Sequence, residues 1–153
     1  MIQRIQTVYL LLVSLLNLAV LFFPLAIIRS GEEFYTLDAT GFNTMTTPPE
    51  LVYPTWALIA LIAIISLIAL ITIFLYKKRM LQIRFCIFNS VLMLAFYGLL
   101  AFLVWKVTGD VADFHFGVRL ALAFPLIALI LNYLAIRNIG ADEVLVRSLN
   151  RLR

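Results

Sequence analysis

The chain has 153 residues, of which 64% are hydrophobic and 13% are charged, and its formal net charge at pH 7 is +4. A soluble domain is about half apolar and about one quarter charged, so this chain lacks the polar surface of a water-exposed globular protein. Its basic residues lie beside long apolar runs, which disfavours nucleic-acid binding and indicates a small multi-pass membrane protein.

Four apolar runs are long enough to cross a membrane. A helix rises about 1.5 Å per residue, so about 20 apolar residues span a hydrocarbon core of about 30 Å. We predict one all-α domain, an antiparallel four-helix transmembrane bundle, with helices at about 6–28, 54–76, 85–105 and 116–136. The first run is too long for a cleaved signal peptide and no small-residue cleavage site follows it. Pro24 is expected to kink or end that helix.

The predicted outer loops cover residues 29–53 and 106–115. In the first of them, residues 34–37 and 42–45 flank the turn-forming residues 38–41, a pattern that indicates a short β-hairpin. An isolated hairpin is only marginally stable in water, so it would have to rest on the helix ends or on a partner.

The predicted turn at 77–84 carries four positive charges that belong in water, because Lys or Arg at mid-bilayer costs roughly 2.5–3.5 kcal/mol each. Nine of the twelve Lys and Arg residues fall on the same side as this turn: Arg4, Lys77, Lys78, Arg79, Arg84, Arg137, Arg147, Arg151 and Arg153. Cytoplasmic loops are enriched in these residues, so the turn and both termini are predicted to be cytoplasmic.

The predicted cytoplasmic tail covers residues 137–153. Gly140 is expected to stop the fourth helix, and Asp142 and Glu143 to begin a short basic amphipathic helix at the headgroup layer. Together with the turn, this helix is predicted to contact anionic lipid headgroups or a protein partner. The basic residues assigned to this contact are Lys77, Lys78, Arg79, Arg84, Arg147, Arg151 and Arg153.

Helices in lipid associate through small and polar residues. In the fourth run, such residues recur at helical spacing and are expected to face the bundle, namely Ala121, Pro125, Ala128, Asn132 and Ala135. Asn89 is predicted to lie at the depth of Asn132 and to bond it, and Asn17 to pair with Ser66. We interpret these four as polar packing residues, and a polar ligand site is the alternative.

Residues suited to catalysis are scarce. No Asp, Glu, Lys or His lies deep in a predicted span, which disfavours a pump or coupled transporter. One Cys, Cys86, excludes an intramolecular disulfide, and one His excludes a two-His haem within the chain. Asp110, Asp113 and His115 are a weak candidate metal site, against the simpler interpretation of a solvated loop. No cofactor is expected.

Three stretches together resemble a known family: residues 1–7 (MIQRIQT), 76–86 (YKKRMLQIRFC) and 142–153 (DEVLVRSLNRLR). They are similar to the domain-of-unknown-function family numbered 4293, small four-helix inner-membrane proteins from Bacteroidota. The resemblance covers the chain from end to end. It implies a bacterial inner membrane and no assigned activity or catalytic residues. All three stretches lie on the predicted cytoplasmic side, which suggests that a contact there matters.

The predicted function is that of a non-catalytic scaffold or partner subunit, acting through its cytoplasmic basic face, its outer loop or both. A lipid- or lipophile-binding protein or carrier is the alternative, and a metal-dependent enzyme at the outer boundary is a weaker third. Small residues at every third position from 57 to 69 leave a homo-oligomer open as well.

Overall fold

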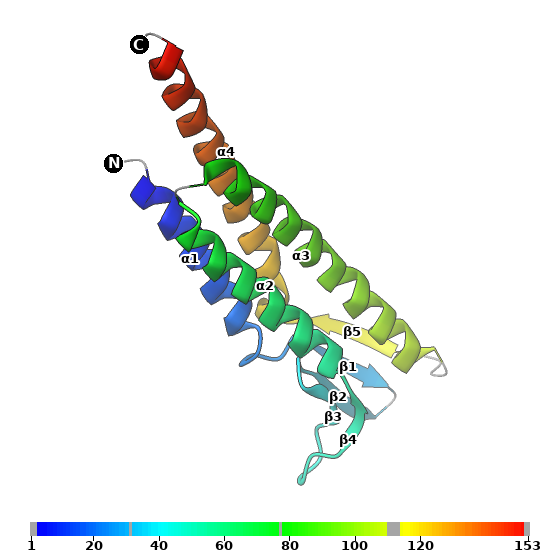
Figure 1. The fold of residues 1–153 in the computed structure, drawn as a ribbon. Coiled ribbons are helices and arrows are strands. Elements are labelled where there is room, and N and C mark those ends of the chain that lie inside the picture. Colours follow the sequence, from blue (N-terminus) through cyan, green and yellow to red (C-terminus); the bar gives the residue numbers. More distant parts are fainter. Residues whose placement is uncertain (1–2, 31, 77, 110–113, 152–153) are drawn as a thin grey trace.

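The computed structural model describes residues 3–30, 32–76, 78–109 and 114–151. Within these residues, four α-helices form an antiparallel bundle, and a five-stranded sheet covers one end of it (Figure 1). The helices are α1 (Gln3–Ala19), α2 (Trp56–Phe74), α3 (Arg79–Thr108) and α4 (Phe124–Arg151), with a short 3-10 helix η1 (Leu120–Ala123) leading into α4. The strands are β1 (Ala26–Ser30), β2 (Glu33–Leu37), β3 (Gly41–Thr44), β4 (Leu51–Pro54) and β5 (Phe114–Val118).

The described residues contain three helical stretches that are long and apolar enough to cross a membrane: Trp56–Phe74, Arg79–Thr108 and Leu120–Val146. The stretch Ile5–Ala19 is apolar but shorter. Each helix packs against two neighbours, α1 and α3 each lying against both α2 and α4. The prediction of a mainly helical protein with membrane-length helices is therefore confirmed, whereas the all-α class is wrong because of the sheet.

The predicted first helix, 6–28, is wrong in its second half. α1 ends at Ala19, the next three residues form tight turns, and residues 26–30 form β1. Pro24 has no amide hydrogen and cannot continue a helical ladder. Ile27 and Ile28 are β-branched and favour a strand, which here gains hydrogen-bonded neighbours on both sides.

The sheet has the order β4-β3-β2-β1-β5, and every neighbouring pair is antiparallel. The predicted hairpin is confirmed as β2 and β3, in which Leu37 faces Phe42. β5 is formed by residues that were predicted to end the second outer loop and begin the fourth helix. The fourth helix, α4, therefore begins at Phe124 and not at 116. A Cβ on Gly117 would lie 3.3 Å from the Ile27 carbonyl oxygen, so glycine permits this close pairing of β5 with β1.

Two other predicted boundaries are wrong at the opposite end of the bundle. α3 begins at Arg79, so most of the predicted turn 77–84 is helical. α4 runs through Gly140 to Arg151, so there is no stop at Gly140 and no separate amphipathic helix. At about 1.5 Å per residue, α3 is about 45 Å long and α4 about 42 Å, and both exceed the span of a hydrocarbon core.

The sheet and the bundle share one hydrophobic core. Leu25, Ile28 and Phe42 from the sheet region are buried in the same cluster as Leu58 and Phe96 from the helices. The Thr55 hydroxyl, 1% exposed, donates to the backbone oxygens of residues 38 and 39, which ties the β2–β3 turn to the start of α2. These contacts fix the sheet on the end of the bundle.

Candidate functional site

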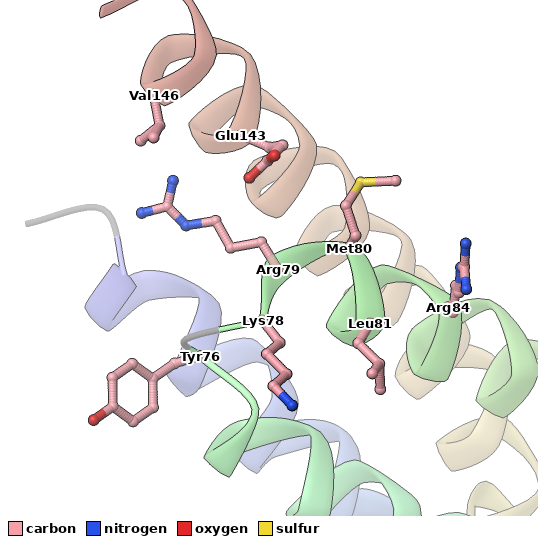
Figure 2. A pocket seen from close by; sticks show the side chains of 8 residues that line it. All are labelled: Tyr76, Lys78, Arg79, Met80, Leu81, Arg84, Glu143 and Val146. Carbon is pink, nitrogen blue, oxygen red and sulfur yellow. The ribbon is translucent and has the colours of Figure 1, made fainter. Parts of the chain in front are cut away.

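The α2–α3 turn and the C-terminal part of α4 enclose an open pocket of about 680 Å³ (Figure 2). We call it the basic pocket. It is lined by three basic residues, one acidic residue and four largely apolar ones, namely Lys78, Arg79, Arg84, Glu143, Tyr76, Met80, Leu81 and Val146. The elements that line it lie at the end of the bundle opposite the sheet (Figure 1).

Buried polar contacts hold the basic pocket together. The Arg79 Nη1 donates to the Asp142 backbone oxygen at 3.1 Å, which joins the start of α3 to α4. The Asp142 Oδ2 accepts a hydrogen bond of 2.6 Å from the Gln6 Nε2, which joins α4 to α1. Gln6 and Asp142 are 5% and 8% exposed. Asp142 thus joins α4 to both α1 and α3.

The electrostatics of the basic pocket favour an anion. The lining has three cationic side chains and one carboxylate, and it includes residues of the first turn of α3, whose backbone amides carry partial positive charge. Arg and Lys bind carboxylates and phosphates through charge-assisted hydrogen bonds. Tyr76 and Met80, each about half exposed, add apolar surface beside these charges. The pocket therefore suits a group that is negatively charged and partly apolar.

Of the seven predicted basic contact residues, Lys78, Arg79 and Arg84 line the pocket. Arg147 and Arg151 lie on the C-terminal part of α4, and Lys77 and Arg153 lie outside the described residues. The roles of Gln6 and Asp142 were missed.

The signal for Asp142 was present in the spacing of α4. The buried stripe predicted there is confirmed, since Ala121, Pro125, Ala128, Asn132 and Ala135 are all buried. The same spacing continues through Ile139 to Asp142. A buried carboxylate at the end of this stripe requires a polar partner, which Gln6 supplies.

The four predicted packing residues, Asn17, Ser66, Asn89 and Asn132, all lie in the bundle interior with at most 3% exposure. The predicted pairings are wrong, because neither an Asn89–Asn132 nor an Asn17–Ser66 hydrogen bond forms among the described residues. The Asn132 Nδ2 instead donates to the Cys86 backbone oxygen at 2.7 Å and to the Ser90 Oγ at 2.8 Å. Asn132 therefore bonds one residue of α3 on each side of Asn89.

A second cavity of about 660 Å³ lies between the sheet-side half of α3, β5 and η1. We call it the outer groove. Its lining is mostly apolar and comprises Tyr97, Leu100, Ala101, Val104, Trp105, Thr108, Gly109, Phe116 and Leu122. The Tyr97 hydroxyl donates to the Leu122 backbone oxygen and the Thr108 hydroxyl to that of Val104. Because these hydroxyls are already bonded, the groove suits an apolar ligand.

The weak metal candidate is not assembled by the described part of the chain. His115 is exposed on β5 and lies opposite Arg29 of β1, while Asp110 and Asp113 lie outside the described residues. Among the described residues, no three His, Cys, Asp or Glu side chains are grouped so as to hold a metal ion. On the sheet, the Tyr35 hydroxyl donates to the Glu33 carboxylate, and this hydrogen bond, with burial and the charge of Glu33, raises the pKa of Tyr35.

Comparison with known proteins places the chain in a family. No curated protein and no solved structure matches it. A family model described as "Domain of unknown function (DUF4293)" matches residues 2–152, and this range includes all the residues of the basic pocket. The chain therefore belongs to the DUF4293 family of domains of unknown function.

Proposed function

We propose that this protein is a non-catalytic, multi-pass inner-membrane protein that docks an acidic segment of a protein partner in its basic pocket. The observation that carries the proposal is the pocket itself, which is lined by Lys78, Arg79 and Arg84 and by apolar side chains at one end of the bundle. Complementary charge at such a surface steers a partner and selects it against uncharged competitors.

The distribution of charge supports a cytoplasmic location for the basic pocket. The start of α1, the α2–α3 turn and the end of α4 share one end of the bundle, and the sheet occupies the other (Figure 1). Of the Lys and Arg residues that the structure describes, seven belong to the first end, whereas Arg29, Lys106 and Arg119 belong to the sheet end. The positive-inside rule then orients the sheet away from the cytoplasm. α1 has 17 residues, the lower limit for a membrane span, so four crossings remain consistent with this topology.

The composition of the lining of the basic pocket supports docking. The mixture of cationic and apolar side chains matches an acidic, amphipathic peptide. The protein would then act as a membrane-bound partner subunit.

Removing two of the pocket charges is expected to abolish this docking. A photo-crosslinking amino acid placed at Met80, which lines the pocket, should capture one defined protein through an acidic segment in intact cells. In Lys78→Gln/Arg84→Gln the adduct should fall by about tenfold or more, since a tenfold change requires only about 1.4 kcal/mol of lost interaction. The adduct is quantified by mass spectrometry of the crosslinked peptide.

The matched control is Lys106→Gln/Arg119→Gln, which removes the same charge at the sheet end of the bundle. It should leave the adduct unchanged. Equal loss in both variants would show a response to net charge alone, and a crosslink to lipid without any protein adduct would argue against a protein partner.

The outer groove favours a second candidate function, binding of a lipophile. Trp105 lines this groove and is one of only two tryptophans in the chain. In a Trp56→Phe background, a brominated long-chain alcohol added to protein in detergent should quench Trp105 fluorescence and saturate near one molecule per chain. Ala101→Phe, which fills the groove, should weaken the saturable part. Quenching that rises without saturation would indicate partitioning into the micelle and not a site.

A further inference from the structure

The bundle interior contains five buried polar atoms that have no hydrogen-bond partner in the described part of the chain. They are the Asn17 Oδ1, the Ser66 Oγ, both amide atoms of Asn89 and the Asn132 Oδ1. All four residues are at most 3% exposed. Buried polar groups in proteins nearly always have a partner, and ordered water supplies it where protein atoms do not. These five atoms therefore point to something bound among them.

Hydrogen bonds between helices place these residues within about one helical turn of a common level, beginning with α1, α2 and α3. The Ser14 Oγ donates to the Ser66 backbone oxygen, so Ser14 lies at the level of Ser66 and Asn17 lies three residues further along α1. The Gln82 Nε2 donates to the Thr72 backbone oxygen, which sets α2 beside α3. α2 and α3 are antiparallel. Ser66 lies six residues before Thr72 on α2, and Asn89 lies seven residues after Gln82 on α3. Ser66 is therefore within one residue of the level of Asn89.

The remaining contacts close the ring of four helices. The Asn132 Nδ2 bonds the Ser90 Oγ, so Asn132 lies at the height of Asn89. The contact between Gln6 and Asp142 sets α1 against α4. Asn132 lies ten residues before Asp142 on α4, and Asn17 lies eleven residues after Gln6 on the antiparallel α1. By this contact Asn132 is within one residue of the level of Asn17. We call Asn17, Ser66, Asn89 and Asn132 the polar layer.

Apolar side chains surround the polar layer. Asn89 lies between Cys86 of one buried cluster and Met93 of the other, and Asn132 lies between Ala135 and Ala128 in the same way. Asn17 and Ser66 lie within the larger cluster. The layer is therefore embedded in the hydrophobic core and is not a polar edge of it.

The unpartnered atoms include both acceptors and donors. The Oδ1 atoms of Asn17, Asn89 and Asn132 accept, the Asn89 Nδ2 donates, and the Ser66 hydroxyl can do both. An occupant must therefore donate to the amide oxygens and accept from the Asn89 amide. An apolar molecule does neither, and an anion cannot donate to the oxygens. A cation would satisfy the oxygens, but it cannot accept a hydrogen bond and would be buried without a carboxylate in the layer.

We infer that the polar layer binds ordered water molecules in the centre of the bundle. Water donates to the three amide oxygens, accepts from the Asn89 amide and can do either at the Ser66 hydroxyl, so every unpartnered atom gains a bond. The waters bridge all four helices and fix their relative height. This inference concerns the bundle interior and does not depend on the proposed docking function.

Replacing Asn89 by leucine gives a test whose sign differs between a hydrated and a dry layer. If water is bound, Asn89→Leu displaces it, leaves the oxygens of Asn17, Ser66 and Asn132 unpaired, and lowers the midpoint of thermal unfolding in detergent. If the layer is dry, the same change removes an unsatisfied amide from the interior and raises the midpoint. Met93→Leu, an apolar exchange one turn away on α3, is the matched control and should change the midpoint little.

A direct measurement keeps the inference testable if the variant does not fold. Water–amide cross-relaxation in the full-length protein, labelled with ¹⁵N-asparagine in micelles, should show long-lived water contacts to the side-chain amide of Asn89. Asn43 on β3, which is half-buried and lies outside the bundle interior, supplies the reference for faster exchanging water. Absence of long-lived water at Asn89 would overturn the inference, and so would a saturable shift of its amide on titration with Na⁺ or K⁺, which would indicate a cation.

Discussion

Gly140→Pro is expected to break α4 and dismantle the basic pocket. Gly140 lies inside α4, and proline there removes an i→i−4 hydrogen bond and clashes with the preceding turn, at a cost of about 3 kcal/mol or more. Glu143 and Val146 line the pocket from beyond this point, so its α4 wall would no longer be fixed. Spin labels at Val91→Cys and Val144→Cys, both exposed positions, should show a broader and shifted distance distribution in a Cys86→Ser background.

The control for this change is Gly140→Ala. No atom lies within 4 Å of a Cβ built on Gly140, so alanine fits without strain and should stabilise α4 by about 0.5–1 kcal/mol through its higher helix propensity. The spin-label distances should stay as in the parent. If Gly140→Pro also left them unchanged, α4 would already be interrupted at this residue.

Phe96→Ala is expected to lower the free energy of unfolding by about 3–5 kcal/mol. Phe96 is 0% exposed and belongs to the cluster in which helices and sheet share a core. Its removal leaves a cavity whose lining loses dispersion contacts, and this loss applies in lipid as well as in water. Unfolding by SDS in mixed micelles, followed by circular dichroism, gives the difference in free energy.

Phe88→Ala is the matched control, because it removes the same side chain from the same helix at a position that is 53% exposed. A lipid-facing ring has lipid tails as its neighbours in both states, so we expect a change of less than about 0.5 kcal/mol. Equal effects at the two positions would contradict the assignment of Phe96 to a shared core.

Hydropathy located the bundle but could not distinguish buried helix from buried strand. Residues 26–28 are apolar because β1 is a central strand, and the same composition would suit the last turn of a membrane helix. Residues 116–118 belong to the edge strand β5 and are exposed, so burial does not explain the wrong prediction there. The hairpin was predictable, since its turn residues and alternating strands are local features.

The errors at Gly140 and at the amides have a different cause. Gly140 is a local stop signal, and the tertiary contacts of Asp142 with Gln6 and Arg79 override it. The distance of Asn89 and Asn132 from the ends of their apolar runs predicted that the two residues lie at the same depth in the membrane. A hydrogen bond between them also depends on the rotation of each helix about its axis. Hydrophobic periodicity sets that rotation only to within the width of a side chain.

The strand order has a consequence for biogenesis. β1 needs β5 on one side, and β5 is synthesised only after α2 and α3. Until the ribosome has completed residues 114–118, one edge of β1 is an uncovered template that can pair with other chains. The sheet can therefore be completed only after α3 has been synthesised. Truncation before residue 114 should yield an aggregation-prone product.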